Sequence, residues 1–378
     1  MTRPAPGLYV HLPYCASRCG YCAFVVTTDG SSRERYLEAI AREAELLEAE
    51  GRSRGAFDSL YLGGGTPSFL PAPAIARLLD VLRARFPFSP DAEVTLEANP
   101  EDVTADAVAA WRDTGVTRVS VGIQSLADRE LSAVGRRHDA AGARRALDVL
   151  AASGLSLSGD LILGLPDQRA ETFRGSLTGL LGSGVEHVSV YLLESEKSKA
   201  IEEDRRLRPE RYLTDDAQAS LWLEMGEILA ARGFAHYEIS NWARPGREAR
   251  HNLKYWIRAP TLGLGVSAHE LWEERRRANV SSLERYLAEL GAGRRPIAFD
   301  IPVRPDEAAR EEIYLGLRLS GGVDAAAIEA FVGATEDVRL WEDYEGWVAA
   351  GILERHGPRV AFTEKGFLVS NEVLSRFV

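Results

Sequence analysis

The sequence predicts an α/β protein: an incomplete, open barrel of six parallel strands, followed by a mostly helical, winged-helix-like domain at the C-terminus. Three observations support this expectation. Short β-branched runs alternate with amphipathic stretches through the first half of the chain, as in parallel βαβ units. Six such units are too few for the usual eight-stranded closure. The C-terminal segment has the order helix, helix, helix, hairpin and closing helix.

The expected strands share β-branched and apolar residues. They are Leu8–Leu12, Ser59–Leu62, Glu93–Ala98, Arg118–Ile123, Leu157–Leu163 and His187–Leu193. The helices expected between them are amphipathic. They are Glu34–Glu50, Ala74–Phe86, Ala105–Thr114, Ala140–Ser153 and Glu171–Ser183. Gly115, Gly154 and Gly184 follow three of these helices, where a C-cap favours a residue that tolerates positive φ. In such folds the chemistry lies at the carboxyl ends of the strands.

We expect the chain to have three parts. Residues 1–195 form the barrel, 196–305 a second region and 306–378 the C-terminal domain. The highly charged segment Glu196–Pro209 indicates a surface connection, and Arg294–Pro305, with three prolines, indicates a linker. A winged helix often binds DNA, but the C-terminal part has fourteen Asp or Glu against seven Arg or Lys. Because such a module is a poor partner for phosphate, we expect a packing or docking role.

The composition indicates an ordinary globular protein, with 45% hydrophobic and 27% charged residues. No apolar run approaches the roughly 20 residues of a membrane-spanning helix, and the first residues lack the pattern of a secretory signal. We therefore expect a cytoplasmic location, where thiols stay reduced. The formal net charge of −11 disfavours nucleic acid as a partner, because phosphate binding requires a basic surface.

The only three cysteines are Cys15, Cys19 and Cys22, just after the first expected strand. Three thiolates on one short loop can converge on a soft metal centre. The odd number and the reducing compartment argue against a disulfide. A structural zinc site, with His11 or another histidine as fourth ligand, is one alternative. An iron–sulfur cluster normally takes four cysteines, so three would leave one iron open for a substrate or cofactor.

These residues resemble the signature of the radical S-adenosylmethionine (SAM) enzymes, which has this cysteine spacing and an aromatic residue, here Tyr21, before the last cysteine. The resemblance implies a 4Fe–4S cluster on the three cysteines. It implies that the open iron chelates the amino and carboxylate groups of SAM. The six-stranded partial barrel is also the fold of that superfamily.

Several polar residues follow the later strands, among them Glu97, Gln124 and Asp160. A carboxylate that faces into a barrel is costly unless it is paired. Each residue alone could make a structural hydrogen bond, but several at one mouth favour a ligand site. Three consecutive glycines, 63–65, mark a close approach of the backbone to another group or a tight strand-to-helix turn. Arg136 could meet a carboxylate with two hydrogen bonds or be a surface charge.

By similarity to the coproporphyrinogen dehydrogenase-like branch of the superfamily, these residues would contact SAM. Gly64, Gly65 and Thr66 match the motif that binds the methionine amino group. Gln124 and Asp160 would hold the ribose hydroxyls, and Arg136 would take the methionine carboxylate. Glu97 would lie beside SAM, and Tyr9 would lie near the sulfonium.

The resemblance to this branch covers residues 9–269, in segments such as "YVHLPYC", "GGGTPS", "EANP", "GLPDQ", "HNLKYW" and "GLGVSAH". Two activities compete within it. The oxygen-independent coproporphyrinogen III dehydrogenases, which decarboxylate a porphyrinogen in haem synthesis, have a further cysteine where this chain has Phe24 and a longer N-terminal extension. HemW-type haem chaperones, which bind haem and deliver it to acceptor proteins, have a His-Asn-x-x-Tyr-Trp motif, matched from His251 to Trp256. These differences favour the haem chaperones.

The resemblance implies haem as a further cofactor, bound by His251 within the family-specific region 196–305. An imidazole can ligate haem iron while aromatic side chains pack on the porphyrin. The alternative is a structural hydrogen bond from His251 beside core aromatics. Tyr237, Glu238 and His269 lie in neighbouring motifs and could support the same pocket.

The expected partners are haem, SAM and an unidentified acceptor protein, which could be membrane-associated. The resemblance leaves open whether SAM is cleaved, and so whether the protein is an enzyme. Two positions depart from many members of the chaperone branch. Ala23 stands where Asp is common, and Val266–Ser267 replace a Cys-Gly pair. The second change leaves fewer candidate thiol ligands for haem.

Overall fold

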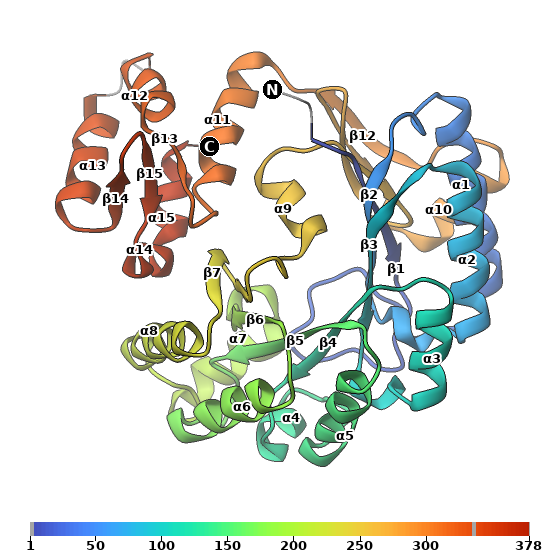
Figure 1. The fold of residues 1–378 in the computed structure, drawn as a ribbon, viewed down its shortest axis with the longest axis horizontal. Helices are drawn as coiled ribbons and strands as arrows, with labels where there is room; N and C mark the ends of the chain where they lie inside the picture. The colour runs from blue at the N-terminus through green and yellow to red at the C-terminus, as the bar shows by residue number, and fades with distance from the viewer. Residues whose placement is uncertain (1–3, 335–337, 378) are drawn as a thin grey trace.

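The structure is a computed structural model that describes residues 4–334 and 338–377. Its central feature is a run of six parallel strands that pair in sequence order (Figure 1). They are β1 (Gly7–Leu12), β2 (Phe57–Gly64), β3 (Phe88–Ala98), β4 (Arg118–Gln124), β5 (Ser156–Leu163) and β6 (His187–Leu192). All six predicted strands are confirmed, each to within a few residues at its ends.

The helices that connect these strands lie on the outer side of the sheet (Figure 1). They are α1 (Arg33–Ala49), α2 (Ala72–Arg85), α3 (Ala105–Asp113), α4 (Asp128–Ala133), α5 (Ala140–Ala151) and α6 (Ala170–Gly182). The five predicted helices are all present. Only α4 was missed, because six residues are too short to show helical periodicity. Gly115, Gly154 and Gly184 have φ angles of 86°, 77° and 80°, as the C-cap argument predicts.

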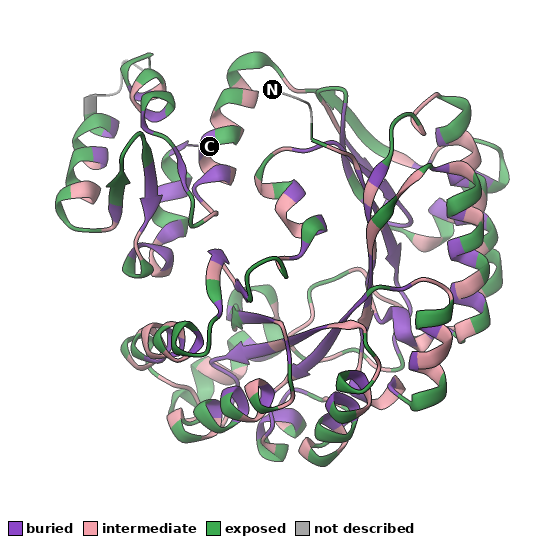
Figure 2. Cartoon of the chain, in the orientation of Figure 1, coloured by how far each residue is buried: buried purple, intermediate pink, exposed green. Residues whose placement is uncertain are grey.

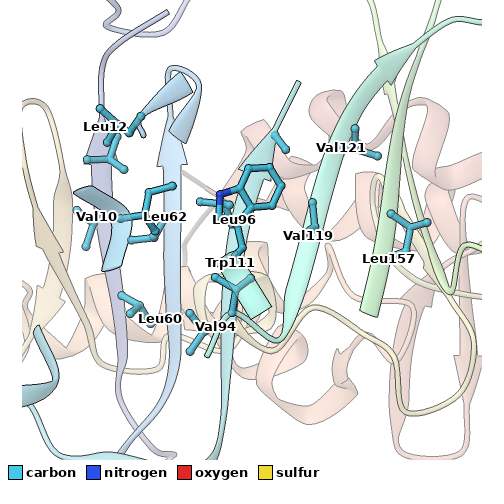
Figure 3. Packing of buried hydrophobic residues seen from close by; sticks show 14 of the residues in the cluster. Val10, Leu12, Leu60, Leu62, Val94, Leu96, Trp111, Val119, Val121 and Leu157 are labelled. Atoms are coloured by element: carbon cyan, nitrogen blue, oxygen red, sulfur yellow. The ribbon is translucent and has the colours of Figure 1, made fainter. Parts of the chain in front are cut away.

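Alternation along each strand separates the core from the barrel interior. The side chains of Val10, Leu62, Leu96 and Val119 are buried beneath the outer helices, and Trp111 of α3 packs there with them (Figure 3). Polar residues occupy the alternate positions on the inner face. The strands are mostly buried, whereas the helices are exposed on the sides that face away from the sheet (Figure 2). The barrel interior is therefore available for polar chemistry.

The sheet continues beyond the barrel on both edges to twelve strands. Beyond β1 lie β9 (Thr261–Leu264), β10 (His269–Trp272), β11 (Arg275–Asn279) and β12 (Ile297–Pro302). Beyond β6 lie β8 (Asn241–Ala243) and β7 (Ala235–Glu238). Strands from both sides of position 195 thus share one sheet, and the expected three-part division stays a prediction.

The expected linker 294–305 is wrong over residues 297–302, which form the edge strand β12. An edge strand needs hydrogen bonds on only one side, so it tolerates proline at its end, and Pro302 pairs in register with Arg275 of β11. The charged segment 196–209 contains helix α7 (Lys199–Leu207). Its single buried side chain is Ile201, which agrees with the expected surface position.

Helices α8 (Asp215–Ala231), α9 (Arg250–Trp256) and α10 (Leu283–Gly291) complete the larger body. Helix α9 lies on the inner side of the sheet, opposite the outer helices (Figure 1). Among the described residues, no helix combines the length and the apolar character needed to cross a bilayer.

The C-terminal part has its own hydrophobic core. Its elements are α11 (Pro305–Gly316), β13 (Val323–Asp324), α12 (Ala325–Ala334), α13 (Val338–Ala349), β14 (Leu353–His356), β15 (Arg359–Phe362), α14 (Glu364–Leu368) and α15 (Ser370–Leu374). The predicted order of three helices and a hairpin is confirmed, and the single predicted closing helix is two short helices, α14 and α15. This part attaches to the larger body near β7, where the Ile239 N–H donates to the Arg318 carbonyl at 2.9 Å.

Candidate cofactor site

A cavity of about 540 Å³ lies at the carboxyl ends of the barrel strands, where parallel barrels place their chemistry. Ten of the twelve predicted site residues line this cavity. They are Cys15, Cys19, Cys22, Gly64, Gly65, Thr66, Glu97, Gln124, Arg136 and Asp160. The fold thus brings together residues that are up to 145 positions apart in the sequence.

The cysteine loop is closed at its base by backbone hydrogen bonds. The Thr27 N–H donates to the Pro13 carbonyl at 2.8 Å, and the Cys15 N–H donates to the Thr27 carbonyl at 3.0 Å. Within the loop, the Cys22 N–H donates to the Cys19 carbonyl at 3.1 Å. All three thiols are free of disulfide bonds. Their loop is therefore held at both ends while the sulfur atoms face the cavity.

Two of the thiols accept hydrogen bonds from one connected network. The Thr66 hydroxyl donates to Cys15 Sγ at 3.3 Å, and Arg136 Nη1 donates to Cys19 Sγ at 3.8 Å. Asn99 joins the two donors, because its Nδ2 donates to Thr66 Oγ1 at 3.3 Å and its Oδ1 accepts from Arg136 Nη2 at 2.8 Å. Donors around a ligating sulfur orient it and stabilise the thiolate.

The donor set fits an iron–sulfur cluster better than the zinc alternative. His11, the suggested fourth zinc ligand, has both ring nitrogens engaged, one with the Tyr9 hydroxyl at 3.0 Å and one with the Val25 carbonyl at 2.9 Å. Burial raises the pKa of the Cys15 and Cys22 thiols, so deprotonation calls for a bound cation.

The glycine segment is packed against the cysteine loop. A Cβ on Gly64 would lie 2.5 Å from the His11 ring, and one on Gly65 would lie 2.7 Å from the Pro13 carbonyl carbon. The Gly65 and Thr66 N–H groups donate to the carbonyls of Leu12 and Tyr14. An ammonium group only donates hydrogen bonds, so a bound one would pair with carbonyl oxygens of this segment. The close approach that the glycines predict is thus an approach to the loop that carries Cys15.

Gln124 has two features that point to a ligand. Its φ is +64°, in the left-handed region where a non-glycine residue is strained. Its Oε1 is buried and has no hydrogen-bond partner among the residues that the structure describes. Buried polar atoms are nearly always paired, so this oxygen suits a hydroxyl donor from outside the chain.

The two predicted carboxyls of the cavity, Glu97 and Asp160, are partly buried. Glu97 accepts hydrogen bonds from the Tyr61 hydroxyl at 2.7 Å and from the Gly64 N–H at 3.0 Å. Asp160 accepts from the Ser120 hydroxyl at 3.2 Å. Burial raises the pKa of Glu97 to about 7 and that of Asp160 to about 6. Each carboxyl can therefore hold a proton near neutral pH.

The raised pKa of Glu97 predicts a pH-dependent stability. Its pKa is about 7 in the folded chain against 4.5 for an ordinary Glu. Between these values the folded chain binds more protons than the unfolded chain, so the free energy of unfolding falls as pH rises from about 4.5 to about 7. Urea unfolding of cofactor-free protein should show this fall. Glu97→Gln should reduce it by on the order of 3 kcal/mol at most.

The exposed Glu203 provides the matched control, because Glu203→Gln should leave the pH dependence unchanged. An equal pH dependence in wild type and Glu97→Gln would contradict the prediction.

Tyr9 and His251, the other two predicted site residues, do not line the cavity. Their rings form a cluster with the ring of Tyr61, and the Tyr9 and His251 rings also stack on each other at 6.3 Å. The Tyr9 ring stacks 6.1 Å from the Tyr61 ring, and the His251 ring stacks 5.3 Å from it. His251 is 1% exposed, and both of its nitrogens have partners, Ser59 Oγ at 3.0 Å and the Tyr255 hydroxyl at 2.9 Å. Haem binding by His251 stays a prediction.

Sequence reasoning missed Asn99 and Tyr191 of the cavity. Asn99 follows β3 directly, two positions after Glu97, and could have been found as a second polar residue at that strand end. Tyr191, near the end of β6, is 45% exposed and lines the cavity. It pairs in register with Ile162, two positions after Asp160 in β5, but an aromatic residue in a strand gives no polar signal.

Comparison with known proteins agrees with this site. The model of the radical SAM superfamily matches residues 9–178, and the model of the HemN C-terminal domain matches residues 303–369. A Mycobacterium tuberculosis (strain H37Rv) protein named heme chaperone HemW is 37% identical over 97% of this chain and 93% of its own length. The heme chaperone HemW of Escherichia coli K12 is 31% identical over 99% of this chain and 98% of its own length.

The fold is also that of a solved structure, the Escherichia coli coproporphyrinogen III oxidase HemN, described as a radical SAM enzyme. It superposes with a TM-score of 0.84 at 23% identity, over 99% of this chain and 90% of the other. Membership of the superfamily implies a 4Fe–4S cluster and SAM as cofactors, and the cysteine loop and the cavity fit both. The chain belongs to the radical SAM superfamily and, within it, to the family of the HemW haem chaperones.

Proposed function

We propose that this protein is a haem chaperone of the cytoplasm. It holds a 4Fe–4S cluster on Cys15, Cys19 and Cys22, binds SAM in the adjoining cavity, and transfers haem to acceptor proteins. The single observation that carries the proposal is the similarity to proteins named haem chaperones along nearly the whole chain, at 37% identity for the Mycobacterium relative. An acceptor in the membrane is compatible with this role.

The residues that line the cavity fit the proposed binding of both the cluster and SAM. The cluster supplies single-electron chemistry next to SAM when both are bound. Thr66 and Arg136 donate to the ligating sulfurs, which stabilises their negative charge. Gln124 Oε1 and the Asp160 carboxyl are acceptors for ribose hydroxyls. Glu97 keeps a proton or a negative charge beside SAM depending on pH.

One residue favours the chaperone over the decarboxylating dehydrogenase. Phe24, at the position where the dehydrogenases have a further cysteine, is 67% exposed and lines the cavity. An exposed large apolar side chain at a cavity rim suits contact with another apolar surface. It supplies no sulfur to the site.

A haem titration tests the proposal. Protein reconstituted anaerobically with iron and sulfide should shift and sharpen the Soret band of added haemin, with saturation near one haem per chain. The same preparation, given SAM, a reductant and coproporphyrinogen III, should form no decarboxylated product. An unchanged Soret band would contradict the proposal, and decarboxylated porphyrin would assign the protein to the dehydrogenases.

A further inference from the structure

If the chain binds haem, as proposed above, few of its side chains can ligate the iron. Haem iron in proteins is held by His, Cys, Met or Tyr. The three cysteines belong to the cluster loop, and Met225 is 1% exposed in the core. Met1, the other methionine, lies outside the described residues. Among the residues that the structure describes, histidine and tyrosine are therefore the remaining candidate ligands.

The exposed tyrosines are poor candidates. Tyr191 and Tyr255 are the described tyrosines with more than a third of their surface accessible, at 45% and 39%. Burial of their hydroxyl groups, with nearby carboxylates in addition, raises the pKa of both. The Tyr255 hydroxyl is already hydrogen-bonded to His251 Nε2 at 2.9 Å, and Tyr191 lines the cluster cavity, so neither tyrosine is placed to ligate a separate haem.

Six of the seven histidines are poor candidates for a haem ligand. Each has a ring nitrogen that is hydrogen-bonded or ion-paired, or is enclosed by neighbouring side chains. Four are nearly inaccessible, and three of these four have hydrogen-bond partners at both nitrogens. The other two are paired with glutamates, and one of them is packed between aromatic rings. The six are His11, His138, His187 and His251, then His236 with Glu364 and His356 with Glu354.

His269, at the start of β10, differs from all of these. It is exposed, and its Nδ1 lies 3.0 Å from the Ser267 carbonyl oxygen. A carbonyl only accepts, so Nδ1 carries the proton and the Nε2 lone pair is left free. No other residue in the described ranges bonds to Nε2. Metal-ligating histidines show this arrangement, in which a hydrogen bond to a backbone carbonyl sets the tautomer and the ring orientation.

The turn before His269 holds this carbonyl in place. Ser267 has a φ of +58°, which is unfavourable for a residue with a side chain. Its N–H donates to the Val280 carbonyl at 2.9 Å. A strained conformation persists where surrounding contacts determine it, and here it aims the carbonyl at the His269 ring.

The surface beside His269 suits a flat apolar ligand. The strand register places His269 opposite Ala278 of β11, and Ala278 opposite Phe299 of β12, so the three side chains share one face. The Phe299 ring is 6.0 Å from the imidazole, and Phe299 and Ile301 are 40% and 52% exposed. Ala278 is 5% exposed, so the two rings cover it and leave their outer sides, with Ile301, as an exposed apolar surface.

We propose that His269 supplies an axial ligand to the haem iron through Nε2, with the porphyrin lying against the exposed side chains of Phe299 and Ile301. The site is at an open edge of the sheet, where an acceptor protein can reach a bound haem. It is distinct from the cluster cavity, which His269 does not line. His251 then has the structural role that its two hydrogen bonds indicate.

Haemin titration of full-length protein with a reconstituted cluster tests this assignment. His269→Ala should weaken haemin binding at least tenfold and remove the Soret band of ligated haem. Added imidazole should restore that band in the variant. His269→Met should bind haemin with altered visible bands, because the iron ligand has changed from nitrogen to sulfur. His356→Ala, a surface histidine of the C-terminal part, is the matched control and should behave as wild type.

The outcomes separate this inference from the proposed function. Wild-type protein that binds no haemin would overturn the haem-chaperone proposal itself. Wild-type binding with an unchanged Soret band and affinity in His269→Ala would overturn only the ligand assignment. Loss of the band in His251→Ala, with a wild-type thermal midpoint and with His269→Ala unaffected, would assign the ligand to His251.

Discussion

Cys22→Ser is expected to abolish assembly of the iron–sulfur cluster. The serine hydroxyl is a harder donor that does not ionise near neutral pH, so only two thiolates would remain on the loop. Iron and sulfide after anaerobic reconstitution should fall from about four each per chain, as in a 4Fe–4S cluster, to less than one. Brown colour and thiolate-to-iron absorption should disappear with them.

The fold should survive this change, because Cys22 is partly exposed and its side chain is outside the core. Thr66→Val is the informative companion variant. It removes the hydrogen bond to Cys15 Sγ but keeps all three thiols, so the cluster should form and should be easier to lose in air. Full iron content in Cys22→Ser would show that the loop is not the ligand set. Zinc without iron in the wild type would restore the zinc alternative.

Gly65→Ala is expected to disturb both the fold and the cluster loop. The added methyl would lie 2.7 Å from the Pro13 carbonyl carbon and 2.9 Å from its oxygen. That oxygen accepts the hydrogen bond from Thr27 that closes the base of the cysteine loop. Since backbone cannot move aside as a side chain tip can, we expect a loss of about 1–3 kcal/mol in the free energy of unfolding.

Urea unfolding and iron content of the reconstituted protein measure the two effects of Gly65→Ala. Gly55→Ala is the matched control, because Gly55 has a φ of +90° and a Cβ there would meet nothing within 4 Å. It should lose some stability through backbone strain alone and retain a full cluster. A Gly65→Ala protein with wild-type stability and a full cluster would show that the segments are not packed as described.

Local patterns predicted the barrel well. Each strand is a short run rich in β-branched residues. The observed strand ends differ from the predicted ones because backbone hydrogen bonds to the neighbouring strand extend beyond that run. The C-cap glycines were predictable because the positive φ is a property of one residue. The edge strand β12 was not predictable from the sequence. Its prolines indicate a linker, and only its pairing with β11 makes it a strand.

The candidate site also has one part that the local sequence predicts and another part that it does not. The three cysteines lie within eight positions, so their common loop was evident from the chain. The Asn99 bridge between Thr66 and Arg136 was not, because it joins the ends of β2 and β3 to the segment after helix α4. The hydrogen bond between His251 and Ser59 spans 192 positions, and no local pattern reports on it.

The sequence by itself determined the fold class, the cluster loop and the family, because these depend on residue type and on spacing along a short stretch. The tertiary structure alone decided which of the polar residues still have a free atom. Burial and pairing depend on which strands become neighbours. For that reason His251, prominent in the sequence, is closed by two hydrogen bonds, and His269 presents a free nitrogen to the surface.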